Sequence, residues 1–385
     1  MISNPPLPLS DQDVLRWRLE FPMLERKIHV ANCSHSPESH RVRRAIEDYL
    51  DSWSAQGMDW DYWLAEVEAA KGEFARLVNA APGEIAITTC ASAAVASIAS
   101  ALDPKGARRR VVTTQAEFPT VGHVWLAHEK YGFAVDFIPL RDEKIAIEDY
   151  EERVDERTVI TSATHIYYKN GFKQDIAEIA RIVHDAGSLL LVDAYQSLGN
   201  CPVDVRRLDA DILVGGNLKY LLGLPGVAFI YVKEELAERF EPALTGWFGR
   251  VNPFAFEPRQ LDYAPGARRF EAGTPPIITA AAARAGMEII NEVGPDRIEE
   301  RIRHLSEHAI AAAREAGLDY AGPTDLGQKG PVTAIRVPDP DEAERRLRAS
   351  GIVAAARGDV IRVAPHFFTT TEELDRVMAA VAQIL

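Results

Sequence analysis

The chain has 385 residues, 47% of them hydrophobic, which is enough to bury a sizeable core and favours a large and a smaller domain. Its formal net charge of −14 argues against nucleic acid or an anionic membrane as the main partner. The three cysteines, Cys33, Cys90 and Cys201, show no paired spacing, so they indicate neither a disulfide framework nor a zinc site, and no metal is expected.

The beginning of the chain lacks the features of an export signal. The sequence MISNPPLPLSDQD has neither the basic nor the apolar region of a signal peptide, and no apolar run is long enough to span a bilayer. We therefore expect a cytoplasmic protein. Residues 1–30 are expected to form an N-terminal segment that joins the smaller domain, and from His40 the apolar residues follow helical spacing.

Strands and helices alternate through residues 84–232. The runs LLLV (189–192) and ILV (212–214) are apolar at every position, which is typical of parallel strands covered on both faces. This α/β alternation predicts a large domain, residues 31–275, with a mostly parallel sheet sandwiched by helices. The expected strands are 84–89, 109–114, 133–138, 159–164, 189–193, 211–215 and 226–232, and the helices placed between them are 91–102 and 176–187.

The last third of the chain has a different pattern. Residues 235–275 are rich in Pro, Gly and aromatic residues and have little periodicity, so we expect a long functional loop region. Two long helices are expected from residue 277, followed by a strand at 332–337, a helix near 340–350, short strands and a final helix. Residues 276–385 are therefore expected to form a smaller α+β domain.

Two strand ends carry the residues with the clearest chemistry. The run LLLVD ends on Asp193, and Lys219 follows the next apolar run, DILV, in a turn of small residues. Because ligands of open parallel sheets bind beyond the carboxyl ends of the strands, the acid and the amine should face one crevice. Pyridoxal phosphate requires such a pair, since a lysine forms the Schiff base and a carboxylate keeps the pyridine nitrogen protonated. Taken singly each residue is more often structural, but together they favour this cofactor.

A phosphate site is expected where strand 84–89 meets helix 91–102. The small residues Ala91 and Ser92 would let backbone N–H groups of the helix start approach an anion, and the Ser92 hydroxyl could add a hydrogen bond. The same residues fit an ordinary helix start, with Ser92 as the N-cap, equally well. Neither GxxxxGK[ST] nor GxGxxG occurs, so a nucleotide site, or an NAD or flavin enzyme, has no support.

Six motifs follow one another along the chain: EFPT (117–120), THIYYKNG (164–171), NLKYLLGLPG (217–226), GWFGRVNPFAF (246–256), ARRFEAGTPPI (267–277) and IRVAP (361–365). In this order they resemble the motifs of the class V group of fold-type-I pyridoxal-phosphate enzymes. This group includes cysteine desulfurases, kynureninases and isopenicillin N epimerase-like proteins. The resemblance runs from about Phe21 to Phe368, is most specific to kynureninase, and implies the pyridoxal-phosphate transferase fold and a small or medium α-amino acid as substrate. The motif RFEAGTP is equally typical of cysteine desulfurases.

The resemblance implies roles for positions around the cofactor. Lys219 would carry it as a Schiff base, Asp193 would pair with the pyridine nitrogen, and Gln196 would reach the phenolic oxygen. Phe118, in EFPT, would stack on the ring. The further cofactor contacts would be Ala91 and Ser92 at the phosphate, together with Thr164.

The resemblance also implies contacts from a partner subunit and to the substrate. Trp247 and Thr274 are similar to residues that reach the phosphate from the partner subunit, which implies an obligate homodimer. Arg362 would clamp the substrate's α-carboxylate, because a planar guanidinium can bond both carboxylate oxygens; a surface salt bridge is the alternative. His35, in NCSHS, would either face the substrate or only cap a turn.

The sequence departs from the family patterns at two positions near the cofactor. Leu218 precedes the lysine where kynureninase has tyrosine and desulfurases have histidine, so this side chain cannot donate to phosphate or relay a proton. Tyr167 stands where desulfurases have a cofactor-binding asparagine. Lyase or hydrolase chemistry of the kynureninase type is therefore favoured only narrowly over transamination.

Efficient cysteine desulfuration is not expected. In desulfurases the reactive thiolate lies on the C-terminal domain near the carboxylate-binding arginine, whereas no cysteine follows Cys201 here. Cys33 and Cys90 precede the strands that carry the cofactor, and Cys90 is expected against the phosphate. A desulfurase-like enzyme or C–S lyase and a non-catalytic cofactor-binding protein remain alternatives, although the intact Lys219–Asp193 pair argues against the last.

Overall fold

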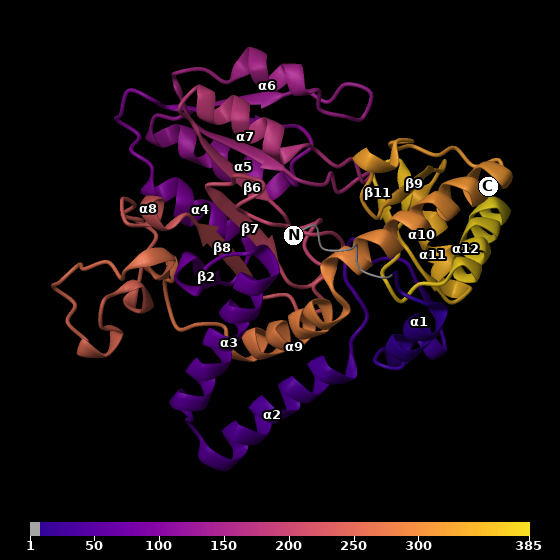
Figure 1. Cartoon of the computed structure of the whole chain (residues 1–385), viewed down its shortest axis with the longest axis horizontal. Helices are drawn as coiled ribbons and strands as arrows, with labels where there is room; N and C mark the ends of the chain where they lie inside the picture. The colour runs from indigo at the N-terminus through magenta and orange to yellow at the C-terminus, as the bar shows by residue number, and fades with distance from the viewer. Residues whose placement is uncertain (1–7) are drawn as a thin grey trace, which may run out of the picture.

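A seven-stranded mixed sheet forms the centre of the computed structural model, which describes residues 8–385 (Figure 1). The strand order is β2-β8-β7-β6-β5-β3-β4. The expected mostly parallel sheet is confirmed, except that β8 runs antiparallel to both of its neighbours. Every residue of β8 is buried, as in a central parallel strand, so its composition does not reveal its direction. The strands are β2 (Ile85–Thr88), β3 (Arg110–Thr114), β4 (Ala134–Ile138), β5 (Thr158–Thr164), β6 (Leu189–Asp193), β7 (Ile212–Gly216) and β8 (Ala228–Val232).

Helices cover both faces of this sheet. Successive strand residues point to opposite faces, so Val111 joins the apolar cluster that contains α4 and α5, while Val112 joins the cluster that contains α3 and α7. In β6, Leu191 likewise joins the cluster with α4 and α5, and Leu190 joins the cluster with α3 and α7. Within residues 8–385, no helix is both long and apolar enough to cross a membrane. The covering helices are α3 (Trp60–Val78), α4 (Ala91–Ala101), α5 (Pro119–His128), α6 (Ile147–Arg153) and α7 (Ile176–Asp185).

The connection after β8 is largely irregular, as expected for residues 235–275. It contains only the short helix α8 (Glu234–Ala237) and single 3-10 turns. Residues 244–263 of this connection project from the body as an arm, seen at the left of Figure 1. Val251, Phe254, Phe256 and Leu261 are exposed on it.

The C-terminal part builds a second, smaller sheet beside the first (Figure 1). Its strands follow the antiparallel order β11-β12-β9. The long helix α9 contacts α2 and α3 of the larger part, and the domain boundary at residue 275 remains a prediction. The elements are α2 (His40–Gln56), α9 (Ile277–Val293), α10 (Pro295–Glu315), β9 (Thr333–Arg336), α11 (Pro340–Ala349), β10 (Ile352–Val353), β11 (Ala355–Arg357), β12 (Val360–Val363) and α12 (Thr371–Ile384).

The N-terminal segment contacts this smaller part. Strand β1 (Ile28–His29) pairs in parallel with β10, and Arg18, at the end of α1 (Asp11–Arg18), donates to the Glu373 carboxylate at 2.8 and 2.9 Å. Phe21 is fully buried, with its ring centroid 4.4 Å from that of Phe368. The apolar contact therefore reinforces the ion pair in holding the segment in place.

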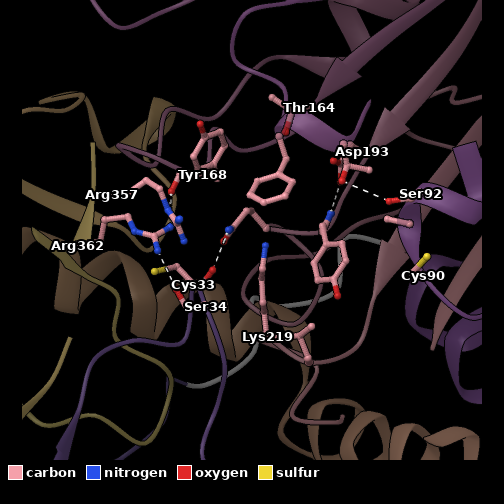
Figure 2. A pocket seen from close by; sticks show the side chains of 16 residues that line it. Cys33, Ser34, Cys90, Ser92, Thr164, Tyr168, Asp193, Lys219, Arg357 and Arg362 are labelled. Carbon is pink, nitrogen blue, oxygen red and sulfur yellow. Dashed lines mark hydrogen bonds between the residues drawn. The ribbon is translucent and has the colours of Figure 1, made fainter. Parts of the chain in front are cut away.

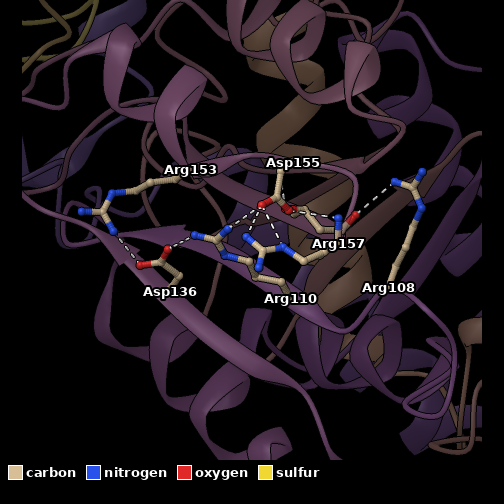
Figure 3. A network of polar contacts seen from close by, with 7 residues as sticks. Arg108, Arg110, Asp136, Arg153, Asp155 and Arg157 are labelled. Carbon is tan, nitrogen blue, oxygen red and sulfur yellow. Dashed lines mark hydrogen bonds and ion pairs between the residues drawn. The ribbon is translucent and has the colours of Figure 1, made fainter.

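An ion-pair network joins β3, β4 and β5 at the edge where these strands begin (Figure 3). Arg110, the first residue of β3, contacts Asp136 of β4 and lies 3.1 Å from Asp155. Arg153 binds the other oxygen of Asp136 at 2.7 Å, and Arg157 also contacts Asp155. Because the network lies where parallel strands begin, it is remote from the carboxyl edge, at which ligands of such sheets bind.

We expect Phe21→Ala to destabilise the protein by about 3–5 kcal/mol, since it removes a fully buried ring and leaves a cavity against Phe368. The measurement is the midpoint of urea unfolding followed by tryptophan fluorescence. Leu19→Ala is the matched control, because Leu19 is 73% exposed and its loss should change stability by no more than about 0.5 kcal/mol. Equal midpoints for the two variants would show that the segment is not held by this contact.

Candidate active site

A cavity of about 310 Å³ lies at the carboxyl edge of the large sheet, closed on one side by β11 and β12 (Figure 2). It is lined from segments far apart in the sequence, from Cys33 to Arg362. Most of the site residues predicted from the sequence meet here. They are Ala91, Ser92, Phe118, Thr164, Asp193, Gln196, Lys219 and Arg362.

Asp193 ends β6 and places its carboxylate at the floor of the cavity. Its Oδ1 accepts a hydrogen bond of 2.9 Å from the Tyr195 N–H, which fixes the side chain in the turn after the strand. Burial raises the pKa of Asp193, while the Tyr195 hydrogen bond and the nearby Lys219 ammonium lower it. The Tyr195 N–H and the Lys219 ammonium therefore stabilise the ionised form of a carboxyl group that burial disfavours.

Lys219 follows β7 and carries its amine into the same cavity. The Nζ lies 4.3 Å from the centroid of the Tyr195 ring and 5.5 Å from that of Phe118. Burial lowers the pKa of Lys219 to about 8, although Asp193 opposes the shift. The amine is therefore deprotonated more readily than an exposed lysine, as a nucleophile or base requires.

The position of the Tyr195 ring depends on a glycine. A Cβ at Gly216, the last residue of β7, would lie 2.1 Å from that ring, so any larger residue would displace it. The ring in turn lies against the Lys219 amine. This close approach explains why small residues precede the lysine in the sequence GGNLK.

Helix α4 begins at the opposite side of the cavity from the arginines (Figure 2). In the described structure no side chain caps this helix start, and Ser92 instead donates from Oγ to Thr120 Oγ1 at 3.3 Å. The N-cap alternative for Ser92 is therefore not the one observed, because the N-cap is Cys90. Uncapped N–H groups of a first helical turn form a ready site for an anion.

Arg362 on β12 is a buried cation without a carboxylate partner among the described residues. It is only 1% exposed, and it donates to Tyr168 O at 3.0 Å and to Ser34 Oγ at 2.7 Å. Its Nε has no partner within residues 8–385. A surface salt bridge, the alternative considered from the sequence, is not what the side chain forms. A buried guanidinium bonded to neutral groups alone favours binding of an anion.

Gln196, Phe118 and Thr164 complete the predicted lining. Gln196 donates from Nε2 to Cys33 O at 3.0 Å, and its Oε1 is buried with no partner in the described chain. Phe118 is 41% exposed where it lines the cavity. Thr164 donates from Oγ1 to Ile166 O at 3.2 Å.

Three predicted residues lie outside this cavity. Trp247 lines a separate depression in the irregular arm, and Thr274 is exposed. His35 is exposed in a shallow groove next to the cavity, with Nδ1 2.7 Å from Ser36 O. The roles inferred for these residues therefore remain predictions.

Several cavity residues were not singled out in the sequence. Cys33, which the sequence places only before the strands that carry the cofactor, lines the cavity on the side of Arg362. Tyr195 also lines the cavity, and its position two residues after Asp193 is a signal that the sequence contains. Arg357 also lines the cavity, but its only signal was a charge beside a short strand.

Glu117, next to Phe118, is a buried carboxyl group behind the cavity. It is only 5% exposed, and neither carboxyl oxygen has a hydrogen-bond partner within residues 8–385. Burial, with a contribution from the negative charge of Asp193, raises the pKa of Glu117 well above its usual range. This direction favours the protonated, neutral form of the Glu117 carboxyl group.

The chain is similar to known proteins over most of its length. The aminotransferase class-V family profile matches residues 30–361. An uncharacterized aminotransferase of Bacillus subtilis (strain 168), YcbU, is 40% identical over 367 residues, covering 95% of this chain and 97% of that protein. Kynureninase of Burkholderia pseudomallei (strain K96243) is 30% identical over 327 residues, covering 81% of this chain and 75% of that protein.

A solved structure shares the fold. The apo cysteine desulfurase of Thermococcus onnurineus NA1 superposes with a TM-score of 0.87 at 23% identity, covering 98% of this chain and 99% of that one. Together with the sequence relatives, this confirms the resemblance inferred from the motifs. The chain belongs to the aminotransferase class-V family and is an enzyme of that pyridoxal-phosphate-dependent family.

We expect Glu117→Gln to stabilise the protein relative to wild type, by an amount that grows as the pH rises above about 4.5. The folded wild type keeps the Glu117 proton, whereas the unfolded chain releases it above the ordinary carboxyl pKa. Unfolding therefore releases a proton, and rising pH lowers the stability of the wild type but not that of the neutral amide. Urea unfolding of both proteins between pH 5 and 8 measures the difference. A difference that does not change with pH would contradict a protonated Glu117.

Proposed function

We propose that the protein uses pyridoxal phosphate to labilise the α proton of an α-amino acid, with Lys219 as the amine that holds the cofactor and transfers the proton. One observation carries the proposal: Lys219 and Asp193 stand at neighbouring strand ends in a cavity whose other side holds the buried Arg362. Pyridoxal phosphate, when bound, condenses with an amine and withdraws electrons from the carbon attached to it.

The donor groups of the cavity fit this cofactor. A lysine of lowered pKa suits its aldehyde, and a buried carboxylate suits its pyridine nitrogen. The uncapped start of α4, at Ala91 and Ser92, suits its phosphate. We assign Phe118, Gln196 and Thr164 to contacts with the rest of the ring.

The same residues define how a substrate would be held. Arg362 offers donors to the α-carboxylate and has no carboxylate partner to lose among the described residues. Lys219, with a pKa of about 8, can accept a proton from the α carbon and return it to another atom. Asp193, whose ionised form is favoured by the Tyr195 N–H and the Lys219 ammonium, supports a positive charge on the group it faces.

Of the reactions that begin this way, transamination and elimination require only Lys219 as acid and base. Leu218 lines the cavity immediately before the lysine and cannot relay a proton to or from water, as hydrolytic cleavage requires. The aminotransferase of B. subtilis is also more similar to this chain than the kynureninase is. We therefore place transamination first. Kynureninase-like cleavage, favoured from the motifs, is kept as the second candidate because EFPT and GWFGRVNPFAF are present.

We also propose that the enzyme works as a homodimer in which each chain completes the site of the other. Trp247 and Thr274 lie outside their own chain's cavity, and the arm that carries Trp247 exposes apolar side chains such as Phe254 and Phe256. An apolar arm of this kind is suited to burial against a second copy of the chain. His35 remains a candidate for the substrate side of the site.

The function is tested by the exchange of the α proton. Lys219→Ala should slow the exchange of α hydrogen of an amino acid substrate in D2O by about 10²- to 10⁴-fold, since it removes the base. Borohydride treatment of the wild type should fix a pyridoxyl group on Lys219, identified by peptide mass spectrometry. Lys105→Ala, which changes an exposed lysine, is the control and should keep both properties. A pyridoxyl label on any other lysine would falsify the assignment. The products then distinguish the reactions, because transamination yields a keto acid and moves the amino group to an acceptor, whereas elimination releases free ammonia.

Complementation between inactive variants tests the shared site. In an equal mixture of Lys219→Ala chains with chains carrying both Trp247→Ala and Thr274→Ala, about a quarter of the sites should have an intact set of residues. Activity should therefore return to about a quarter of the wild-type level after subunit exchange, while each variant alone stays inactive. A wild-type monomer in sedimentation that holds a full complement of cofactor would refute the homodimer.

A further inference from the structure

The register of β11 and β12 places two arginines on one face of the small sheet. Ala355 is paired with Arg362, and Arg357 is paired with Val360. Since residues two apart on a strand point to the same side, Arg357 and Arg362 are diagonal neighbours on the face that lines the cavity. The residue paired with Arg362 is Ala355, whose side chain is a single methyl group.

Neither guanidinium is neutralised by the described part of the chain. Arg362 bonds only to Tyr168 O and Ser34 Oγ, and the Arg357 side chain has no hydrogen-bond or ion-pair partner within residues 8–385. Two carboxylates on neighbouring elements are engaged elsewhere: Asp359 binds Lys169, and Glu344 binds Arg348 and the Ala356 N–H. Two cations that converge without a counter-ion favour anionic ligands.

The two arginines are separate from the expected phosphate site. Figure 2 shows Arg357 and Arg362 on one side of the cavity and Ser92 on the other, with Lys219 between them. A phosphate at the start of α4 therefore does not neutralise the arginine pair. One α-carboxylate supplies a single negative charge, which matches Arg362 and leaves Arg357 unpaired.

We propose that Arg357 binds a second anionic group on the substrate, so that the enzyme selects α-amino acids with an acidic side chain. The inference rests on the proposed function, because it assumes that Arg362 receives the α-carboxylate. Arg357 is exposed at the mouth of the cavity, so its guanidinium is free to meet the end of a short side chain that extends from the α carbon. Its planar donors can bond both oxygens of a carboxylate.

The test compares ligands that differ only in the charge of the side chain. Dissociation constants of the holoenzyme for aspartate, asparagine, glutamate and glutamine are measured from the absorbance of the cofactor. Calorimetric titrations with succinate and propionate, which have no amine, give a second measure that does not depend on reaction. We expect each acid to bind roughly 10- to 100-fold more tightly than its uncharged counterpart, the range for a hydrogen bond between charged groups.

Variants assign this preference to one residue. Arg357→Gln should remove at least about 10-fold of the preference for aspartate and leave asparagine binding within about twofold of wild type. Arg357→Lys should retain part of the preference. Arg345→Gln is the matched control, because it also removes one exposed arginine of the smaller part, and it should behave as wild type.

Two results would overturn the proposal: equal affinity of the wild type for acid and amide, or an equal loss of aspartate and asparagine binding in Arg357→Gln. The second result would show that Arg357 helps to hold the α-carboxylate instead. If no amino acid changes the absorbance while succinate still binds more tightly than propionate, the anion site stands and the proposed function fails. The two ideas are therefore separated by the same set of titrations.

Discussion

Charge that is buried without an equal opposite charge is the constraint on which this cavity depends. Arg362 is shielded from water yet bonds only to neutral oxygens, and Lys219 has a lowered pKa because burial disfavours its charged form. Leaving charges unpaired in a low-dielectric region destabilises a fold. The rest of the molecule must therefore supply enough stability to keep these groups in place until anionic ligands complete them.

Two sheets supply that rigidity from different directions. The large sheet brings Asp193 and Lys219 to one edge, because β6 and β7 are parallel and end side by side. The small sheet presents Arg357 and Arg362 through the pairing of β11 with β12. The floor and wall of the cavity thus come from elements whose spacing is fixed by backbone hydrogen bonds, while the aromatic side chains of Phe118, Tyr168 and Tyr195 line the space between.

The strand pattern was enough to predict Asp193 and Lys219, because the end of a buried strand is a position that a single sequence can reveal. The resemblance to a family added Arg362 and the lining near Phe118. The importance of Glu117 could not be predicted, since it depends on the loss of water around a carboxyl group and on the proximity of Asp193. The position of Arg357 in the cavity could not be predicted either, because it depends on the register between two short strands. The direction of β8 depends on tertiary packing and not on its composition.

The reversed strand β8 determines where the irregular arm can begin. Val232, at the end of β8, pairs with Ile212, at the start of β7, so the chain leaves the large sheet at the edge remote from Lys219. No residue of the arm from 244 to 263 lines the cavity in the described structure. Insertions or deletions in this arm would therefore leave the walls of the chain's own cavity unchanged, and would act on the chemistry only through the second chain's site, which Trp247 is proposed to complete.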